Sequence, residues 1–477
     1  MFIVDFFNNI LWSYVVIYGL IGIGIYFTYK TRFIQFRYIK EMIRVIFEKT
    51  PANAAGEKSI SAFKSFCIGS ATRIGTGNLA GVAVAITVGG PGAVFWMWLV
   101  ALLGGATSFV ESTLAQVYKA KDPEKPGTFR GGPAYYITKG LNKKWLGIIF
   151  AVLIAFTFGL IFNSVQSNTI SAAFETAFGF NTAITGIVLA AVTGVIIFGG
   201  VHRIANFSSV IVPIMAVCYI AVAFFVIITN ITHLPAVLAL IVKNAFGFEQ
   251  AIGGGIGVAI MQGVRRGLFS NEAGMGSAPN AAATAHVSHP AKQGFIQTLG
   301  VYVDTIIVCT ATAFVILVST DIFNAGQYEG INLLQASLSA QVGSWANIFI
   351  AVSILLFAFS SIVGSYYYGE TNIQFITKNK AVLNIFRFAT IAFVIIGAVA
   401  KLGMVWNVAD LFMGLMTVIN LIAIFALSKV AFKVLKDYEG KRKQGLDPVF
   451  NPKELGIENT ECWEREELEQ ERQVKIS

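Results

Sequence analysis

Two hydrophobic segments of the chain are interrupted by glycines in a way that could expose backbone groups to a ligand. The first is Ile68–Gly81 and the second is Ala251–Gly263, which contains three consecutive glycines. Free amides at the start of a helix favour a carboxylate, and free carbonyls at the end of a helix favour a cation. Two such breaks could therefore hold a zwitterion and a cation between them.

The composition around these segments indicates a membrane protein. Hydrophobic residues make up 55% of the 477 positions and charged residues only 13%, which excludes an ordinary soluble surface. Unwound backbone is tolerated in a bilayer only where protein or a polar cavity satisfies its hydrogen bonds. Paired interruptions in two halves of a chain are typical of a transporter's binding site. The sequence therefore predicts a secondary transporter.

Apolar runs of about 20 residues, enough to cross a bilayer core of about 30 Å, recur along the chain. We expect about eleven membrane-spanning helices in an all-α fold. Their predicted ranges are 11–29, 63–88, 93–118, 146–174, 182–198, 210–228, 250–269, 295–318, 346–368, 383–399 and 405–427. Apolar and basic residues mix over residues 33–49, which predicts an amphipathic helix on the membrane surface. From about Lys429 the chain is charged, which predicts a short amphipathic piece followed by disorder.

Lysine and arginine predict the orientation, because short cytoplasmic loops retain positive charge. They gather in alternate loops, whereas the other set of loops offers only Lys243 and Lys401. The N-terminus is therefore expected outside and the C-terminal tail in the cytoplasm. The same loops account for the net charge of +9, so we expect no nucleic-acid partner.

The spacing of the two breaks predicts inverted repeats. The second break comes five spans after the first, and an odd offset reverses the direction of the chain. We expect an extra N-terminal helix plus interfacial helix over 1–59, a first five-helix repeat over 60–230, a second over 231–428, and a tail over 429–477.

Four strings of residues resemble the alanine or glycine:cation symporter family. They are Ile74–Gly81, Gly89–Trp98, Arg266–Pro279 and Tyr367–Glu370. The resemblance implies a leucine-transporter-type fold, with ten core spans in two inverted five-span repeats after one additional helix. It also implies sodium-coupled uptake of a small neutral amino acid such as alanine or glycine, across the plasma membrane of a prokaryote.

The expected substrate site combines the two breaks with two positions taken from the resemblance. Amides at the first break would face the substrate carboxylate, and residues of the second break would face the same ligand. Helix packing by small residues, or an interhelical hydrogen bond in the case of the glutamine, is the competing interpretation. The predicted substrate-binding residues are Gly75, Thr76, Gly77, Gln166, Ala259, Ile260, Met261 and Ser365.

Cation binding is expected from neutral oxygens, a donor set that suits sodium better than a proton. The set combines one side-chain amide, two backbone carbonyls at the first break and two adjacent hydroxyls, by resemblance to the leucine-transporter sodium site. The predicted sodium ligands are Asn78, Ala71, Ile74, Ser360 and Ser361. The alternative for the serines is a hydrogen bond to a carbonyl of their own helix.

Four charged residues fall within predicted spans, where each costs roughly 3 kcal/mol unless it is paired or hydrated. Arg73 and Glu111 lie in neighbouring spans, so we expect a salt bridge between them that acts as an inner gate or brace. Asp304 and Asp410 are either coupling residues or members of structural pairs.

One position departs from the family pattern. Relatives that transport alanine or glycine carry a tryptophan just before the Tyr367–Glu370 string, where this chain has Gly364-Ser365-Tyr366. A serine there would enlarge the pocket, which favours a longer neutral substrate, glutamine above all. A membrane enzyme is disfavoured because no metal-binding or nucleophilic arrangement lies in the spans. An uncoupled channel is the nearer alternative.

Overall fold

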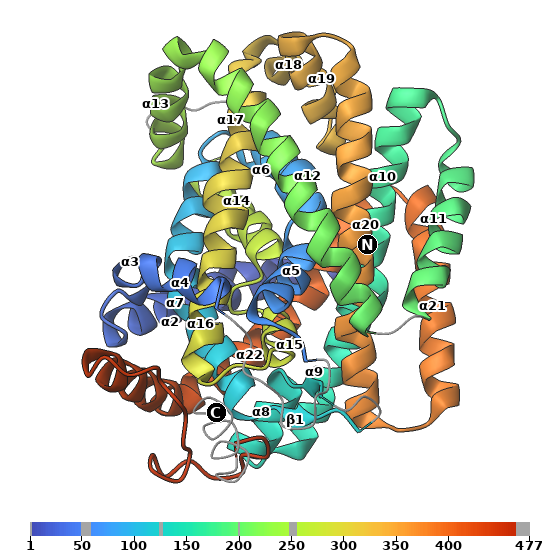
Figure 1. Ribbon diagram of the computed structural model, residues 1–477. Coiled ribbons are helices and arrows are strands. Elements are labelled where there is room, and N and C mark those ends of the chain that lie inside the picture. Colours follow the sequence, from blue (N-terminus) through green and yellow to red (C-terminus); the bar gives the residue numbers. More distant parts are fainter. Residues whose placement is uncertain (1, 49–58, 124–126, 199–200, 248–254, 464–477) are drawn as a thin grey trace.

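The computed structural model describes residues 2–48, 59–123, 127–198, 201–247 and 255–463, and these are mostly helical (Figure 1). Seven helices are long and apolar enough to cross a membrane, or eight if the pair 213–229 and 231–245, bent by 76°, is one span. The strands in this part of the chain, β1 (Ala120–Lys121) and β2 (Phe129–Arg130), form one antiparallel hairpin. The chain is therefore a multi-pass membrane protein of the all-helical class.

The first half of the chain supplies the first broken helix and its neighbours. Its elements are α1 (Phe2–Ile10), η1 (Leu11–Val16), α2 (Ile17–Lys30), α3 (Ile34–Arg37), α4 (Ile39–Ile46), α5 (Ala62–Arg73), η2 (Gly77–Gly81), α6 (Val82–Gly89), α7 (Ala93–Val117), α8 (Pro133–Gly140), α9 (Lys144–Phe156), η3 (Thr157–Phe162), α10 (Asn163–Phe178), α11 (Thr182–Ile197) and α12 (Val201–Thr229).

The second half supplies the second broken helix. Its elements are η4 (Ile231–His233), α13 (Leu234–Ala245), α14 (Ile256–Asn271), α15 (Ala278–Ala283), α16 (Pro290–Val301), η5 (Tyr302–Cys309), α17 (Thr310–Val318), α18 (Thr320–Asn324), α19 (Gly330–Val342), α20 (Trp345–Ile376), α21 (Lys380–Val399) and α22 (Leu402–Lys443).

The long helices lie where the sequence predicts spans, but three predicted spans are shorter or interrupted. Helices 2–30, 93–117, 144–178, 290–318, 345–376, 380–399 and 402–443 have the length to cross a bilayer. The predicted spans at 63–88 and 250–269 correspond to helices that are cut short, and α11 has only 16 residues. The count of eleven spans therefore stays a prediction.

The bundle has two distinct ends. The tail side, at the bottom of Figure 1, carries α8, the β1–β2 hairpin and residues 444–463. The far side, at the top, carries α13, α18 and α19. Between them α6 packs against α14 and α5 packs against α15, while α20 packs against α5 and α10. The four pieces of the two broken helices thus lie together inside the bundle.

The amphipathic helix predicted over 33–49 is confirmed as a helix. It forms α3 and α4, which bury Ile34 and Met42 against the protein and leave Phe36, Ile39 and Ile43 about half exposed. Its contact with a membrane surface stays a prediction.

The disorder predicted in the tail is wrong for residues 444–463. Helix α22 continues to Lys443, and the chain then packs along the tail side, with Phe450 fully buried and Trp463 5% exposed. These aromatic residues bury enough apolar surface to order a segment whose composition is otherwise polar. Residues 464–477 lie outside the described residues.

Candidate functional site

The first predicted break is confirmed at Gly75. Helix α5 ends at Arg73, Ile74 is extended (φ −79°, ψ 91°), and the helix resumes with η2 at Gly77. The amide of Gly75 donates to Asn78 Oδ1 (3.0 Å), and the amide of Thr76 donates to Gln166 Oε1 (3.0 Å). The two amides that the sequence assigns to a carboxylate are therefore not free, because each donates to a side-chain oxygen, one of them to the predicted glutamine.

Close packing explains why glycines occupy this break. A Cβ atom on Gly75 would lie 2.2 Å from Ser361 Oγ, and one on Gly77 would lie 3.0 Å from the Cα of Ser270. The packing interpretation thus holds for both glycines, and it is compatible with a binding role. Because Ser270 belongs to α14, its contact with Gly77 also shows that α14 reaches the first break.

The second break is not where the sequence predicts it. Helix α14 runs without interruption from Ile256 to Asn271, so Ala259, Ile260 and Met261 lie in regular helix. The interruption follows at Glu272 (φ 60°), Gly274 (φ 91°) and Gly276 (φ 85°), before α15 begins at Ala278. The glycine run of the prediction instead ends at the start of α14, where Gly255 is extended, and residues 251–254 lie outside the described residues.

A buried carboxylate joins the two broken helices. Asp304, in the π-helical turn η5, accepts hydrogen bonds from Asn78 Nδ2 (2.6 Å) and Ser270 Oγ (2.8 Å) and from its neighbour Thr305 (2.8 Å). Its side chain is fully buried, and among the described residues it has no ion-pair partner. A carboxylate ringed by neutral donors and hydroxyl oxygens is a suitable place for a hard cation such as Na⁺.

The predicted sodium ligands are brought together only in part. Ser361 Oγ lies 2.8 Å from the Ala71 carbonyl near the end of α5, as the predicted site requires, and 3.1 Å from the Phe357 carbonyl of its own helix. Ser360 Oγ donates to the Phe357 carbonyl (2.8 Å), so the competing interpretation holds for Ser360. Ile74 contributes the extended residue of the break, and its ligand role stays a prediction.

Ser365 is a buried residue of α20, the helix that packs against α5. It is 1% exposed and sits one helical turn after Ser361, on the face of α20 that also carries Tyr368. The Tyr368 hydroxyl is 3.0 Å from Thr72 Oγ1 in α5. The size of the side chain at position 365 can therefore affect how α20 packs on the tail side of the site.

The predicted Arg73–Glu111 salt bridge is wrong. Arg73 donates to the backbone carbonyl of Gln297 (3.3 Å), and Glu111 accepts from the amide of Gly274 (3.1 Å) and from Asn420 (2.9 Å). Adjacent spans do not ensure that two side chains share a face. Glu111 nevertheless braces a break, because Gly274 belongs to the unwound segment between α14 and α15.

Replacing Glu111 by glutamine is expected to slow uptake about tenfold while leaving expression unchanged, because an amide replaces one acceptor oxygen with a donor that faces Asn420 or Gly274. Initial uptake rates in proteoliposomes measure the effect. Glu175→Gln, at an exposed position of α10, serves as the matched control. An unchanged uptake rate for Glu111→Gln would remove the bracing role.

An aromatic and ionic layer closes the far side of the site. The Phe269 ring is 4.7 Å from Trp406 and 4.6 Å from Phe162. The Arg266 guanidinium lies 4.3 Å from the centre of the Trp406 ring and pairs with Asp410. Asp410 is therefore a paired residue, which settles one of the alternatives that the sequence left open.

Several buried polar atoms near this layer have no hydrogen-bond partner among the described residues. They include Thr76 Oγ1, at the first break, and Trp406 Nε1, as well as Nε and Nη1 of Arg266 and Oδ1 of Asp410. Unsatisfied buried donors are costly, and a polar ligand would satisfy them. The sequence did not predict Trp406 or Phe269 as site residues, although Phe269 lies inside the quoted string Arg266–Pro279.

The charges around the two breaks leave one negative charge in excess if all are ionised. The buried groups are three guanidiniums and four carboxylates, namely Arg73, Arg265, Arg266, Glu111, Glu272, Asp304 and Asp410. Buried charges are stabilised by neutralisation, which a bound monovalent cation or a proton on one of the carboxylates would supply.

Comparisons with known proteins identify the family of the chain. The sequence pattern of the sodium:alanine symporter family matches residues 1–452. The "Probable sodium/glutamine symporter GlnT" of Bacillus subtilis is 59% identical over 97% of this chain and 95% of that protein. The "Amino-acid carrier protein AlsT" of the same organism is 58% identical over 97% of each.

Two more distant relatives extend the comparison. The "Sodium/alanine symporter AgcS" of Methanococcus maripaludis is 38% identical over 91% of this chain and 96% of that protein. A crystal structure of a manganese transporter from Eremococcus coleocola shares the fold, with a TM-score of 0.51 at 11% identity over 86% of this chain and 83% of that one. The chain belongs to the sodium:alanine symporter family and is a sodium-coupled membrane transporter of amino acids, not an enzyme.

Proposed function

We propose that the chain takes up glutamine together with Na⁺ by alternating access, with both ligands bound where the two helices break. The observation that carries the proposal is Asp304, which contacts Asn78 of the first broken helix and Ser270 of the second. A cation bound there would contact both repeats at once. Its occupancy would therefore affect the relative position of the two broken helices.

Two oxygen sets support sodium binding. The first consists of the Asp304 carboxylate and the Ser270 hydroxyl, and the second of the Ala71 carbonyl and the Ser361 hydroxyl. Asn78 faces Asp304 with its amide nitrogen, because its oxygen accepts from the Gly75 amide. The amides of Gly75 and Thr76 donate to the side-chain oxygens of Asn78 and Gln166, so a substrate carboxylate at the break would replace these two oxygens. Thr76 Oγ1 and Trp406 Nε1 are then available to the rest of the substrate.

Glutamine is favoured over alanine by two observations. A relative that is 59% identical carries the name of a sodium/glutamine symporter, whereas the archaeal sodium/alanine symporter is 38% identical. Position 365 holds serine where the alanine- and glycine-transporting pattern has tryptophan. A smaller side chain beside α5 leaves more space for a longer substrate.

Ser365→Trp is accordingly expected to reduce glutamine uptake about tenfold and to reduce alanine uptake less, since overpacking a buried position costs about 1–3 kcal/mol. Competition by unlabelled amino acids against labelled glutamine measures the shift. Ser365→Ala, which keeps the side chain at position 365 small, should retain the wild-type preference for glutamine. Unchanged glutamine transport by Ser365→Trp would refute the size argument.

The architecture that we propose for this mechanism is two inverted five-helix repeats. The first extends over 60–230 and opens with α5 and α6, and the second extends over 231–428 and contains α14 and α15 as its broken helix. The α6–α14 and α5–α15 contacts support an antiparallel arrangement of the two broken helices. Arg266 and Asp410 on the far side would form part of the outer gate.

The proposed orientation places the tail side in the cytoplasm of a prokaryotic cell. The basic loops Lys30–Arg44 and Lys119–Lys143 lie on that side, in accordance with the charge bias of short cytoplasmic loops. One Na⁺ entering down about 100 mV then contributes roughly 2.3 kcal/mol, enough for about 50-fold accumulation of substrate.

The experiment that tests the function is a panel of radiolabelled amino acids in proteoliposomes, with and without a sodium gradient. Saturable uptake that requires sodium and is strongest for glutamine supports the proposal. Uptake that does not saturate and does not depend on sodium would favour the channel instead.

A further inference from the structure

The C-terminal segment 444–463 packs across the tail side of the bundle, over the connection between α15 and α16 and the end of α7. It leaves α22 at a turn whose Gly445 has a φ of +78°. It then buries Phe450 completely and Trp463 to 5% exposure. A free tail would leave both aromatic side chains in water, so this segment is a fixed part of the fold.

The middle of the segment holds the connection between α15 and α16. The Phe450 amide donates to the Ser288 carbonyl (3.0 Å), and Ser288 Oγ donates to the Pro448 carbonyl (2.9 Å). The Phe450 ring packs on His289 at 5.5 Å. Burial lowers the pKa of His289 to about 4, so a neutral imidazole packs here and its contact with Asp437 (3.1 Å) is a hydrogen bond rather than an ion pair.

The same connection holds the start of α5, the tail-side half of the first broken helix. Ile60 forms a β-bridge with Ala285 and accepts a hydrogen bond from the His286 amide (3.0 Å). Ser65 Oγ in α5 donates to the Ala281 carbonyl (2.8 Å). The segment 444–463 therefore restrains α5 through residues 281–289.

The end of the segment reaches α7 and the same connection from the other side. Trp463 Nε1 donates to the Gln116 carbonyl (3.0 Å), and its ring lies 4.7 Å from Lys119 Nζ. Lys119 Nζ in turn donates to the Ala285 carbonyl (3.1 Å). Phe450 and Trp463 contact each other at 5.1 Å. The two aromatic residues thus form one plug that touches both sides of residues 285–289.

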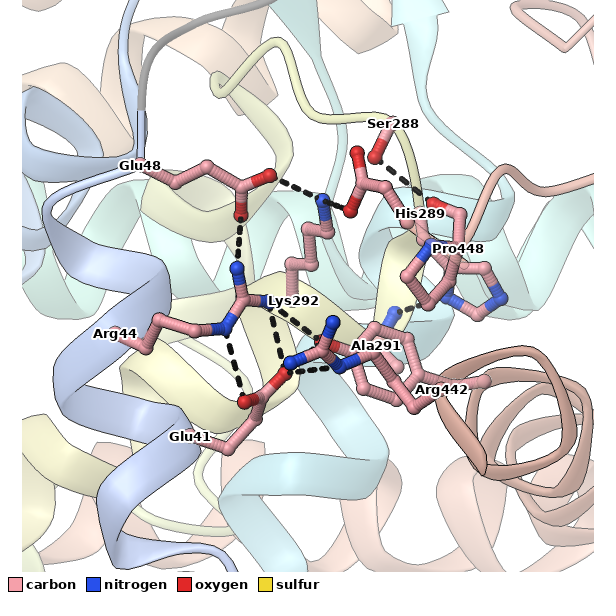
Figure 2. A network of polar contacts seen from close by, with 11 residues as sticks. Glu41, Arg44, Glu48, Ser288, His289, Ala291, Lys292, Arg442 and Pro448 are labelled. Atoms are coloured by element: carbon pink, nitrogen blue, oxygen red, sulfur yellow. Dashed lines mark hydrogen bonds and ion pairs between the residues drawn. The ribbon is translucent and has the colours of Figure 1, made fainter. Parts of the chain in front are cut away.

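Ion pairs extend this plug to the amphipathic helix α4 (Figure 2). Lys292, 2% exposed, contacts Glu48 (2.6 Å) after α4 and Asp447 (2.9 Å) in the segment. Glu41 of α4 contacts Arg44 (2.8 Å) and Arg442 (3.4 Å) near the end of α22. Lys292 is buried, whereas the side chains of Glu48 and Asp447 are 24% and 45% exposed, so these pairs position the segment and contribute little to stability by themselves.

We propose that residues 444–463 form a latch that holds the inner gate closed, so that release toward the cytoplasm requires the latch to move. The inner gate here means the start of α5 together with residues 281–289. An exit path on the tail side has to separate α5 from α15 and its connection, and these are the contacts that the latch supports from below. The role of the latch in transport rests on the proposed alternating-access function, whereas the contacts of residues 444–463 do not depend on it.

The test uses a native thiol as a reporter of gate opening. Cys67 in α5 is 1% exposed, and Cys309, in the centre of the bundle, is 2% exposed. The full chain is treated with N-ethylmaleimide, and the modification rate of each cysteine is followed by peptide mass spectrometry. The double substitution Phe450→Ala with Trp463→Ala is expected to raise the rate at Cys67 about tenfold and the rate at Cys309 less, because the opening begins at α5 whereas Cys309 borders the deeper proposed cation site.

The controls separate a latch from general loosening. Phe450→Leu keeps an apolar plug and should stay near the wild-type rate, as should Trp345→Ala, which alters a half-exposed tryptophan of the far side. An unchanged rate at Cys67 in the double variant, or equal increases at Cys67 and Cys309, would overturn the latch. The measurement needs neither sodium nor substrate. The modification rates can therefore be interpreted even if the proposed transport function is wrong.

Discussion

Asp304→Asn is expected to lower sodium-dependent uptake by about 100-fold, a loss of about 2.8 kcal/mol in the driving interaction. The amide keeps the shape of the side chain and can still hydrogen-bond to Asn78 and Ser270. It removes the carboxylate charge at position 304, and a neutral oxygen binds a hard cation more weakly than a carboxylate. The measurement is the initial uptake rate as a function of sodium concentration.

The control for this substitution is Asp321→Asn, at an exposed position of α18 on the far side, which should transport normally. Thermal unfolding of both variants shows whether the fold is retained. If the uptake rate of Asp304→Asn depends on sodium concentration as that of the wild type does, the carboxylate has only a structural role. The proposed cation site would then be wrong.

Gly75→Ala is expected to abolish uptake. A Cβ atom there would lie 2.2 Å from Ser361 Oγ and 3.1 Å from Gln166 Oε1, so the added methyl group displaces a proposed sodium ligand and a proposed substrate contact together. Overpacking of this kind costs about 1–3 kcal/mol, and at a binding site it also blocks the amides that the ligand needs. Equilibrium binding of labelled glutamine in the presence of sodium measures the loss directly.

The matched control is Gly257→Ala, in the glycine run that the sequence had suggested as the second break. Nothing lies within 4 Å of a Cβ atom there, and alanine favours the helix by about 1 kcal/mol. It should transport as the wild type does. If Gly75→Ala transports normally and Gly257→Ala does not, residues 255–261 rather than Gly75 would be the functional part of the site.

The sequence identified the first break because glycine and threonine interrupt a hydrophobic run there, a local signal. It misplaced the second break because glycine density is a poor guide to where a helix unwinds. The second break lies where Glu272, Gly274 and Gly276 adopt left-handed conformations, whereas the denser glycine run only precedes the start of α14. Pro279, at the start of α15, was a signal that could have located it.

The contacts of the buried charged residues could not be predicted from the sequence for a different reason. Asp304 contacts Asn78 across 226 positions, and Glu111 contacts Asn420 across 309 positions. Such pairs depend on the rotation of each helix about its axis, which the order of spans leaves undetermined. The same reasoning explains why Arg73 and Glu111 were paired wrongly.

The central claim is that sodium and the amino acid bind together at the two breaks, and equilibrium binding of labelled glutamine to the purified protein tests it most directly. We predict that glutamine binding is lost when sodium is replaced by choline, and that glutamine strengthens sodium binding by the same factor, as linkage requires. Glutamine binding of equal strength in sodium and in choline would contradict the account.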